Sequence, residues 1–186
     1  MRQALEPILK INNLQTHFFT KAGILKAVDG VSFEIAAGEI VGLVGESGSG
    51  KSITGFSVMG LVDPPGKIID GNINFKGKDL SALSNDQMQN IRGNRIAMIF
   101  QDPMMTLNPV LRIETQMIEA IQAHDGSISR EDARIRSRDT LGLVGISSPD
   151  ERLRAYPHQF SGGMRQRVSI AIAMLNRPDL IIADEP

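Results

Sequence analysis

Two short stretches of the sequence carry residue types that could hold a phosphate group and a metal ion. The first, GESGSGKS at 45–52, matches the pattern G-x-x-x-x-G-K-[S/T] at every fixed position. In this pattern the glycines let backbone N–H groups turn toward phosphate oxygens, Lys51 reaches the β- and γ-phosphates, and the Ser52 hydroxyl binds Mg²⁺. A chance match is expected in on the order of one percent of chains this long. We therefore predict a phosphate loop made of Gly45, Glu46, Ser47, Gly48, Ser49, Gly50, Lys51 and Ser52.

The second stretch, DLIIADEP at 179–186, places two acidic side chains directly after an apolar run. An apolar run of this length is typical of a buried strand, which would deliver Asp184 to the Mg²⁺ at the phosphate loop. Glu185 would then be placed to orient or deprotonate an attacking water. Taken alone, two acids after an apolar run are more often a solvated strand end. Beside a phosphate loop we favour the catalytic interpretation.

A third stretch, FSGGMRQR at 160–167, has the composition of a helix start. Ser161 can cap the helix, and Gly162 and Gly163 leave backbone N–H groups free at its positive end, where an anion is favoured. These residues alone fit a plain helix cap and a second anion site equally well, so both interpretations stay open.

The hydrophobic pattern predicts the elements that must position these stretches. Period-two alternation indicates half-buried strands, and continuous apolar runs indicate buried ones. Strands are expected at 8–14, 28–35, 40–44, 95–100 and 180–183, with a short strand pair within 71–80. Helices are expected at 113–122, at 130–141 and from Ser161 to Leu175. The order of strands and helices predicts an α/β fold with a largely parallel sheet, in which 40–44 is buried on both faces.

Composition argues against several other classes of protein. The chain has 20 basic and 21 acidic residues and a net charge of −1, so no global field attracts nucleic acid, and no nucleic-acid partner is expected. It has no cysteine, which excludes disulfide scaffolds and fits a reducing compartment. No window reaches the roughly 18 apolar residues of a spanning helix, so we expect any membrane role to come through a partner.

In their order and spacing, the phosphate loop, SGGMRQ at 161–166 and LIIADEP at 180–186 resemble the nucleotide-binding subunits of ABC transporters. FQDPMMTLNP at 100–109 and YPHQFSGGMRQR at 156–167 resemble, more narrowly, the ATPases of dipeptide and oligopeptide importers. The resemblance covers the chain from Ile8 onward.

For the fold, this resemblance implies a P-loop NTPase core with a mainly parallel sheet, an N-terminal antiparallel β subdomain and a helical subdomain. The whole chain, 1–186, would be part of one nucleotide-binding domain. Within it, 1–100 would hold the β subdomain and phosphate-loop core, 101–160 the helical subdomain, and 161–186 the SGG helix and the acidic strand.

For the site, the resemblance implies ATP and Mg²⁺ as cofactors. Gln101 matches the glutamine that contacts Mg²⁺ and couples the site to membrane subunits; otherwise it is an ordinary polar loop residue. Phe18 matches the aromatic residue that stacks on adenine, with Phe19 as the alternative and a core role as the competing interpretation. The implied catalytic residues are Glu185, Lys51 and Gln101. The implied metal ligands are Ser52, Gln101 and Asp184, and the implied second nucleotide contact is made by Ser161, Gly162, Gly163 and Gln166.

For the assembly, the resemblance implies that two subunits, identical or different, close head to tail around ATP. Ser161 and Gly163 of one subunit would complete the site around Lys51 of the other. Further implied partners are transmembrane permease subunits and, indirectly, a periplasmic or extracellular solute-binding protein. The implied location is the periphery of the inner membrane, on its cytoplasmic face. The implied activity is ATP hydrolysis coupled to uptake of a small solute, with di- or oligopeptides favoured.

Related sequences continue past the two acids into a strand that ends in a histidine, whereas all three histidines here lie upstream and nothing follows Pro186. We therefore expect a fold that is truncated at the C-terminus, and 186 residues that alone hydrolyse ATP poorly or not at all. Two alternatives stay open. One is a nucleotide-binding module without turnover, and the other is an importer ATPase for nickel or another solute.

Overall fold

The computed structural model describes residues 7–102 and 106–186, which belong to two compact units, Met1–Gln89 and Asn90–Pro186. Each unit is described by itself. None of the helices in the described ranges has the length and apolar character needed to cross a bilayer.

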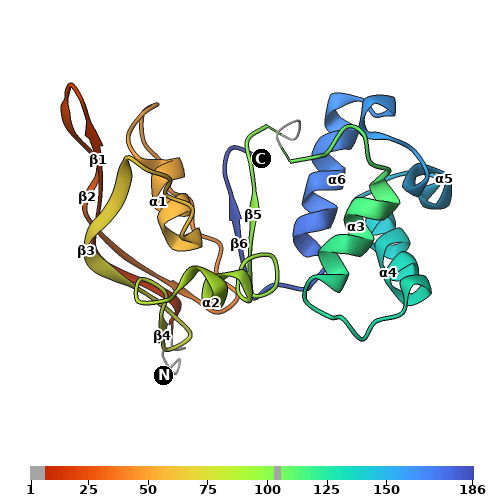
Figure 1. Cartoon of the computed structure of the whole chain (residues 1–186), viewed down its shortest axis with the longest axis horizontal. Coiled ribbons are helices and arrows are strands. Elements are labelled where there is room, and N and C mark those ends of the chain that lie inside the picture. The colour runs from red at the N-terminus through yellow and green to blue at the C-terminus, as the bar shows by residue number, and fades with distance from the viewer. Residues whose placement is uncertain (1–6, 103–105) are drawn as a thin grey trace. The chain divides into compact units, whose positions relative to one another are not determined.

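An antiparallel sheet forms most of the first unit, with strand order β2-β1-β3-β4 (Figure 1). Its strands are β1 (Pro7–Thr20), β2 (Gly23–Ala36), β3 (Gly66–Phe75) and β4 (Lys78–Asp79). β1 is an interior strand and pairs along most of its length with both β2 and β3. The sequence therefore predicted the N-terminal antiparallel subdomain correctly, including the strand pair within 71–80.

The hydrophobic side chains of β1 explain why this sheet has one covered face. Leu9, Ile11 and Leu14 of β1 and Ile73 of β3 are almost completely buried. Helix α1 (Lys51–Met59) packs against β1 and β2 and is joined to β1 by a buried hydrogen bond of 2.8 Å between the hydroxyls of Thr16 and Ser57. A second, short helix, α2 (Asn85–Gln89), completes the unit. The helix that starts at the phosphate loop is thus fixed to the sheet.

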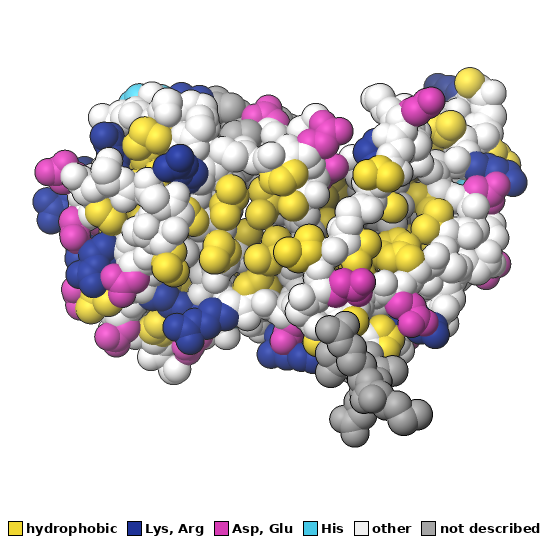
Figure 2. All heavy atoms as spheres, turned by 180° about the vertical axis from the view of Figure 1, so that it is seen from behind, with side chains coloured by type: hydrophobic (Ala, Val, Ile, Leu, Met, Phe, Trp, Pro, Cys, Tyr) yellow, Lys and Arg dark blue, Asp and Glu magenta, His cyan; other side chains and the backbone are white. Residues whose placement is uncertain are grey.

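Residues 40–44 differ from the prediction, because they form no strand. The side chains of Ile40 and Val44 are 100% and 91% exposed. A strand needs hydrogen-bonded neighbours, and none of the strand pairs in the described residues includes this segment. Its apolar side chains contribute to the hydrophobic surface of the molecule, which Figure 2 shows for one face.

Four helices form the core of the second unit, together with one 3₁₀ turn. They are α3 (Ile113–Gln122), α4 (Arg130–Leu143), α5 (Pro149–Leu153) and α6 (Gly162–Met174), with the turn η1 (Pro157–Gln159) before α6. Apolar side chains from all of these helices meet in one core; its fully buried members include Ile113, Met117, Leu141, Leu153 and Val168. The predicted helices are confirmed, and α4 runs two residues further than expected.

A parallel strand pair carries the chain into and out of this helical core. β5 (Ile96–Ile99) and β6 (Leu180–Ala183) pair in register from Ile96 with Leu180 to Ile99 with Ala183. The four residues of β5 are buried, in agreement with its continuous apolar sequence. Because the two strands are parallel, their carboxyl ends lie at the same edge, and the residues that follow each strand are brought together.

Candidate functional site

The phosphate loop ends where α1 begins. Gly50 occupies the N-cap in the left-handed conformation, and the N-terminus of α1 has no side-chain cap hydrogen bond. The first N–H groups of a helix have no partner within the helix, and its positive end favours an anion. The Lys51 ammonium group bends back over the loop and donates to the carbonyl oxygens of Gly45 and Glu46, both at 2.9 Å. The loop therefore presents a backbone cradle with a cation beside it.

The shape of the loop requires a glycine at position 50, and Gly45 lies close to a side chain of the loop. A Cβ on Gly50 would lie 2.1 Å from the carbonyl oxygen of Ala27, and its φ of +91° is unfavourable for other residues. A Cβ on Gly45 would lie 2.5 Å from the Ser49 hydroxyl oxygen. The cradle is thus built from backbone that side chains would obstruct, which fits a group bound by N–H donors.

The two candidate adenine-stacking residues lie at the end of β1. The Phe18 ring packs against Gly66, where an added Cβ would come within 2.7 Å of it. Phe19 is 45% exposed, and its backbone N–H donates to the Pro65 carbonyl at 3.0 Å. The Phe18 ring is thus held by packing, whereas Phe19 is held through its backbone. Both residues remain candidates for stacking on adenine.

Gln101 and Glu185 meet in the second unit, at the carboxyl edge of the β5–β6 pair. The side-chain amide of Gln101 donates to the Glu185 carboxylate at 2.6 Å. The Asp184 N–H donates to the Ile99 carbonyl at 2.9 Å and extends the strand pairing by one residue. Glu185 itself adopts a φ of +47°, which turns it out of the strand direction. Parallel pairing therefore brings together two residues that the sequence had assigned to one reaction.

The SGG stretch forms the start of α6. Ser161 is the N-cap, and its hydroxyl accepts from the Met164 N–H at 3.4 Å, so the predicted cap is confirmed. Gly162 and Gly163 are exposed, and an added Cβ would meet nothing within 4 Å at either. Gln166 lies one turn further along and is partly buried. The helix end is accessible from solvent, as the second interpretation requires.

The residues predicted to bind Mg²⁺ come from both units, Ser52 from the first and Gln101 and Asp184 from the second. Within 7–102 and 106–186 no three acidic, histidine or cysteine side chains are grouped as a metal cage. Mg²⁺ is commonly bound by one or two protein ligands together with substrate phosphates and water. A hydroxyl such as that of Ser52 and a carboxylate such as that of Asp184 are each a ligand type that this mode of binding uses.

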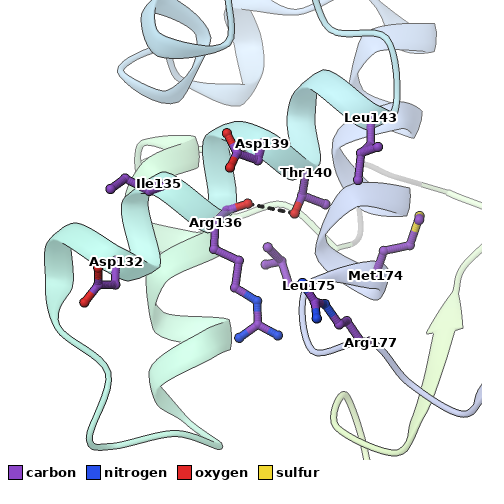
Figure 3. A pocket seen from close by; sticks show the side chains of 9 residues that line it. All are labelled: Asp132, Ile135, Arg136, Asp139, Thr140, Leu143, Met174, Leu175 and Arg177. Atoms are coloured by element: carbon purple, nitrogen blue, oxygen red, sulfur yellow. Dashed lines mark hydrogen bonds between the residues drawn. The ribbon is translucent and has the colours of Figure 1, made fainter.

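A cavity of about 520 Å³ lies between α4 and the end of α6 (Figure 3), and it is lined by none of the predicted site residues. Ile135, Leu143 and Met174 contribute its apolar wall. Asp139, also in the wall, accepts from Arg138 at 2.7 Å, and this contact raises the pKa of Arg138. The charges around the cavity are of both signs, so they select no class of ligand.

Fold and site together define a P-loop nucleotide-binding domain of the α/β class. The family model described as ABC transporter matches residues 28–186, and the chain belongs to that family. In a dimeric, post-hydrolysis structure bound to ADP and Pi, the ATP-binding cassette MJ0796 superposes with a TM-score of 0.82 and 30% identity. The match covers 95% of this chain and 73% of that one.

Similar proteins of known role are ATP-binding subunits for peptide transport. The dipeptide transport ATP-binding protein DppD of Bacillus subtilis (strain 168) is 51% identical over 98% of this chain. The oligopeptide transport ATP-binding protein AppD of the same organism is 50% identical over 98%, and DppD of Escherichia coli (strain K12) is 46% identical over 96%. The chain covers 54%, 56% and 54% of these relatives, so it spans about half of their length.

Proposed function

We propose that the protein binds ATP with Mg²⁺ and hydrolyses it to drive uptake of di- or oligopeptides. The observation that carries the proposal is the start of α1, where a glycine loop presents backbone N–H groups and the Lys51 ammonium group lies across it. The peptide-transport names of relatives at 46–51% identity support the choice of solute. Nickel or another small solute is the competing choice.

In this proposal each side chain has a separate task. Lys51 exchanges its two carbonyl contacts for the β- and γ-phosphates, and the N–H groups at the start of α1 hold the phosphate oxygens. Glu185 orients the attacking water and accepts its proton, and Gln101 positions that water from the same strand edge. Mg²⁺, held by Ser52, Asp184 and Gln101, would neutralise charge on the phosphate oxygens. Phe18 stacks on adenine.

The assembly is proposed on the same basis. The structurally similar cassette MJ0796 is dimeric, which supports head-to-tail closure in which Ser161, Gly162, Gly163 and Gln166 contact the nucleotide of the other subunit. Transmembrane permease subunits would dock near the segment after Gln101, with a solute-binding protein beyond them. The protein would then work at the cytoplasmic face of the membrane.

The test measures ATP binding and ATP hydrolysis side by side. We expect Glu185→Gln to lower turnover by about 10²–10⁴-fold, the usual contribution of a general base, while ATP still binds. Lys51→Met should weaken binding itself. Glu131→Gln, at an exposed position of α4, is the matched control and should change neither. If the unsubstituted protein bound ATP without hydrolysing it, the proposed ATPase would be wrong and the protein would be a nucleotide-binding module.

The solute is tested separately, in vesicles that contain the protein and its membrane partners. ATP-dependent uptake of a labelled dipeptide is the expected result, and Ni²⁺ is offered in parallel. Uptake of Ni²⁺ without uptake of the dipeptide would overturn the peptide assignment and leave the ATPase assignment intact.

A further inference from the structure

One arginine holds both ends of the segment that carries Ser161. The guanidinium Nε–H of Arg165 donates to the carbonyl oxygen of Pro157 at 2.9 Å, and the backbone N–H of Arg165 donates to the carbonyl oxygen of Ser161, also at 2.9 Å. Pro157 starts the turn η1, and Ser161 is the N-cap of α6. The five residues 157–161 are thus closed into a loop by a single residue of α6.

The turn that Arg165 reaches has a defined structure of its own. The Pro157 carbonyl accepts a second bond, from the Phe160 N–H at 3.2 Å. Gln159 accepts from the Tyr156 N–H at 2.8 Å and returns its own N–H to the Tyr156 carbonyl at 2.9 Å. Phe160 is 3% exposed and belongs to the helical core. Arg165 therefore connects the start of α6 to a rigid turn anchored in that core.

A second arginine reinforces the same loop. The guanidinium carbon of Arg152 lies 5.7 Å from the centre of the Phe160 ring, in cation–π geometry. Phe160 directly precedes Ser161, so this contact restrains the residue next to the cap. Arg165 thus contacts Pro157 at the start of the segment that leads from η1 into α6, and Arg152 contacts Phe160 near its end.

We propose that Arg165 is a positioning residue, which holds the Ser161 hydroxyl and the N–H groups of Gly162 and Gly163 in the geometry that binds the γ-phosphate of a nucleotide on a second subunit. The inference rests on the proposed function. Ser161 and the two glycines are exposed, and a Cβ at either glycine would meet nothing within 4 Å, so the glycines have no side-chain packing that fixes their backbone. The Nε–H of Arg165 is directed at Pro157, so the residue acts on the chain around Ser161.

Arg167 provides a matched control from the same helix. Its guanidinium also donates to a carbonyl oxygen at 2.9 Å, that of Gly145, which lies after α4 and outside the SGG segment. Arg165 and Arg167 therefore make the same kind of bond to different places. Replacing each by methionine removes the donor while keeping an unbranched side chain.

The experiment compares Arg165→Met, Arg167→Met and Arg165→Lys in the intact protein. We expect Arg165→Met to lower kcat for ATP by about ten-fold, the effect of losing one charge-assisted hydrogen bond, with the ATP dissociation constant unchanged. Its ATP-dependent self-association, measured by sedimentation in a Glu185→Gln background, should weaken in parallel. Arg165→Lys retains a donor and should recover most of the kcat that Arg165→Met loses. Arg167→Met should keep the kcat of the unsubstituted protein, although its melting temperature should fall about as much as that of Arg165→Met.

The outcomes separate this inference from the proposed function. Equal kcat in Arg165→Met and Arg167→Met, with ATP turnover intact in both, would overturn the positioning role and leave the ATPase standing. A fall in ATP affinity that matches the fall in kcat would show that Arg165 acts on the fold of the whole protein, and would also overturn it. Should Arg165→Met fail to fold, the Arg165→Lys variant decides: full activity supports the role, and a large loss of ATP affinity refutes it. Absence of ATP binding in the unsubstituted protein would remove the proposed function and, with it, this inference.

Discussion

Gln101 donates a hydrogen bond of 2.6 Å to Glu185, from 84 residues away along the chain. The proposed general base is therefore held by the side chain that is proposed to position the water. In the proposed function both side chains turn toward a water at the γ-phosphate. We therefore expect binding of ATP and Mg²⁺ to separate them, so that the bond competes with the proposed catalytic arrangement.

A double-mutant cycle should detect this contact. Gln101→Leu, Glu185→Ala and the double variant are compared by chemical denaturation without nucleotide. We expect a coupling of about 0.5–1 kcal/mol in the free energy of unfolding, because the bond is charge-assisted but exposed. Repeating the cycle in saturating ATP and Mg²⁺ should abolish the coupling. A coupling that persists with nucleotide would mean that the pair does not separate.

Gly50 should be the least replaceable glycine of the phosphate loop for stability. Gly50→Ala would force a Cβ to 2.1 Å from the Ala27 carbonyl and strain the backbone, so we expect a loss of about 3 kcal/mol or more in the free energy of unfolding. Gly48→Ala strains only the backbone, at φ +80°, and should cost about 1–2 kcal/mol.

Gly142→Ala, inside α4 and next to open space, is the control and should stabilise the protein by about 0.5–1 kcal/mol. Thermal melting of all three variants checks the order. If the melting temperature of Gly50→Ala were no lower than that of Gly48→Ala, the expected clash between a Cβ at position 50 and the Ala27 carbonyl oxygen would be contradicted.

Ser161→Asp should distinguish a helix cap from a phosphate contact. Aspartate is also a good N-cap and suits the positive helix end, so the melting temperature should change little. Its charge would repel a γ-phosphate, so ATP-dependent self-association and turnover should fall by at least about ten-fold.

Ser129, the N-cap of α4, is the matched control. Its hydroxyl accepts from the Asp132 N–H at 3.0 Å, and no phosphate is assigned to that helix. Ser129→Asp should therefore leave turnover unchanged. Normal turnover in Ser161→Asp would reduce Ser161 to a structural cap.

Phe18→Leu and Phe19→Leu should separate the two aromatic candidates. Phe18 packs against Gly66, so Phe18→Leu is expected to lower both stability, by about 1 kcal/mol, and ATP affinity. Phe19 is 45% exposed, so Phe19→Leu should change stability by less than about 0.5 kcal/mol. Affinity for ATP is compared with that for inorganic triphosphate, which lacks the base. A base-dependent loss only in Phe19→Leu would move the stacking role to Phe19.

The sequence predicted the elements that depend on local patterns, such as the alternation of apolar and polar residues in a strand or the residue that caps a helix. The strands predicted from alternation at 8–14 and 28–35, the helix at 113–122 and the cap at Ser161 all appear as expected, in β1, β2, α3 and α6, because each depends on a local pattern in the sequence. The residues of the phosphate loop were predicted from type and spacing alone. What the spacing could not give was the bond between Gln101 and Glu185, since it depends on the register of β5 against β6.

Two features were outside the reach of pattern reasoning for other reasons. The run at 40–44 has the composition of a buried strand, yet composition cannot supply a paired neighbour. Arg165 was overlooked because a basic residue on a helix is usually interpreted as solvated. Its only signal in the sequence is its place four residues after Ser161, one helical turn from the cap.

The exposed segment at 40–44 also makes the protein vulnerable to proteolysis. Its backbone belongs to no strand pair among the described residues, and Ile40 and Val44 project into solvent. A protease such as thermolysin, which cleaves beside large apolar residues, needs an extended, accessible segment of this kind. One cut there would break the chain between β2 and the loop that leads into α1, while α1 would stay attached to the sheet by its packing on β1 and β2 and by the chain that continues to β3. The segment that was expected to be a buried strand beside the site is instead an accessible connection.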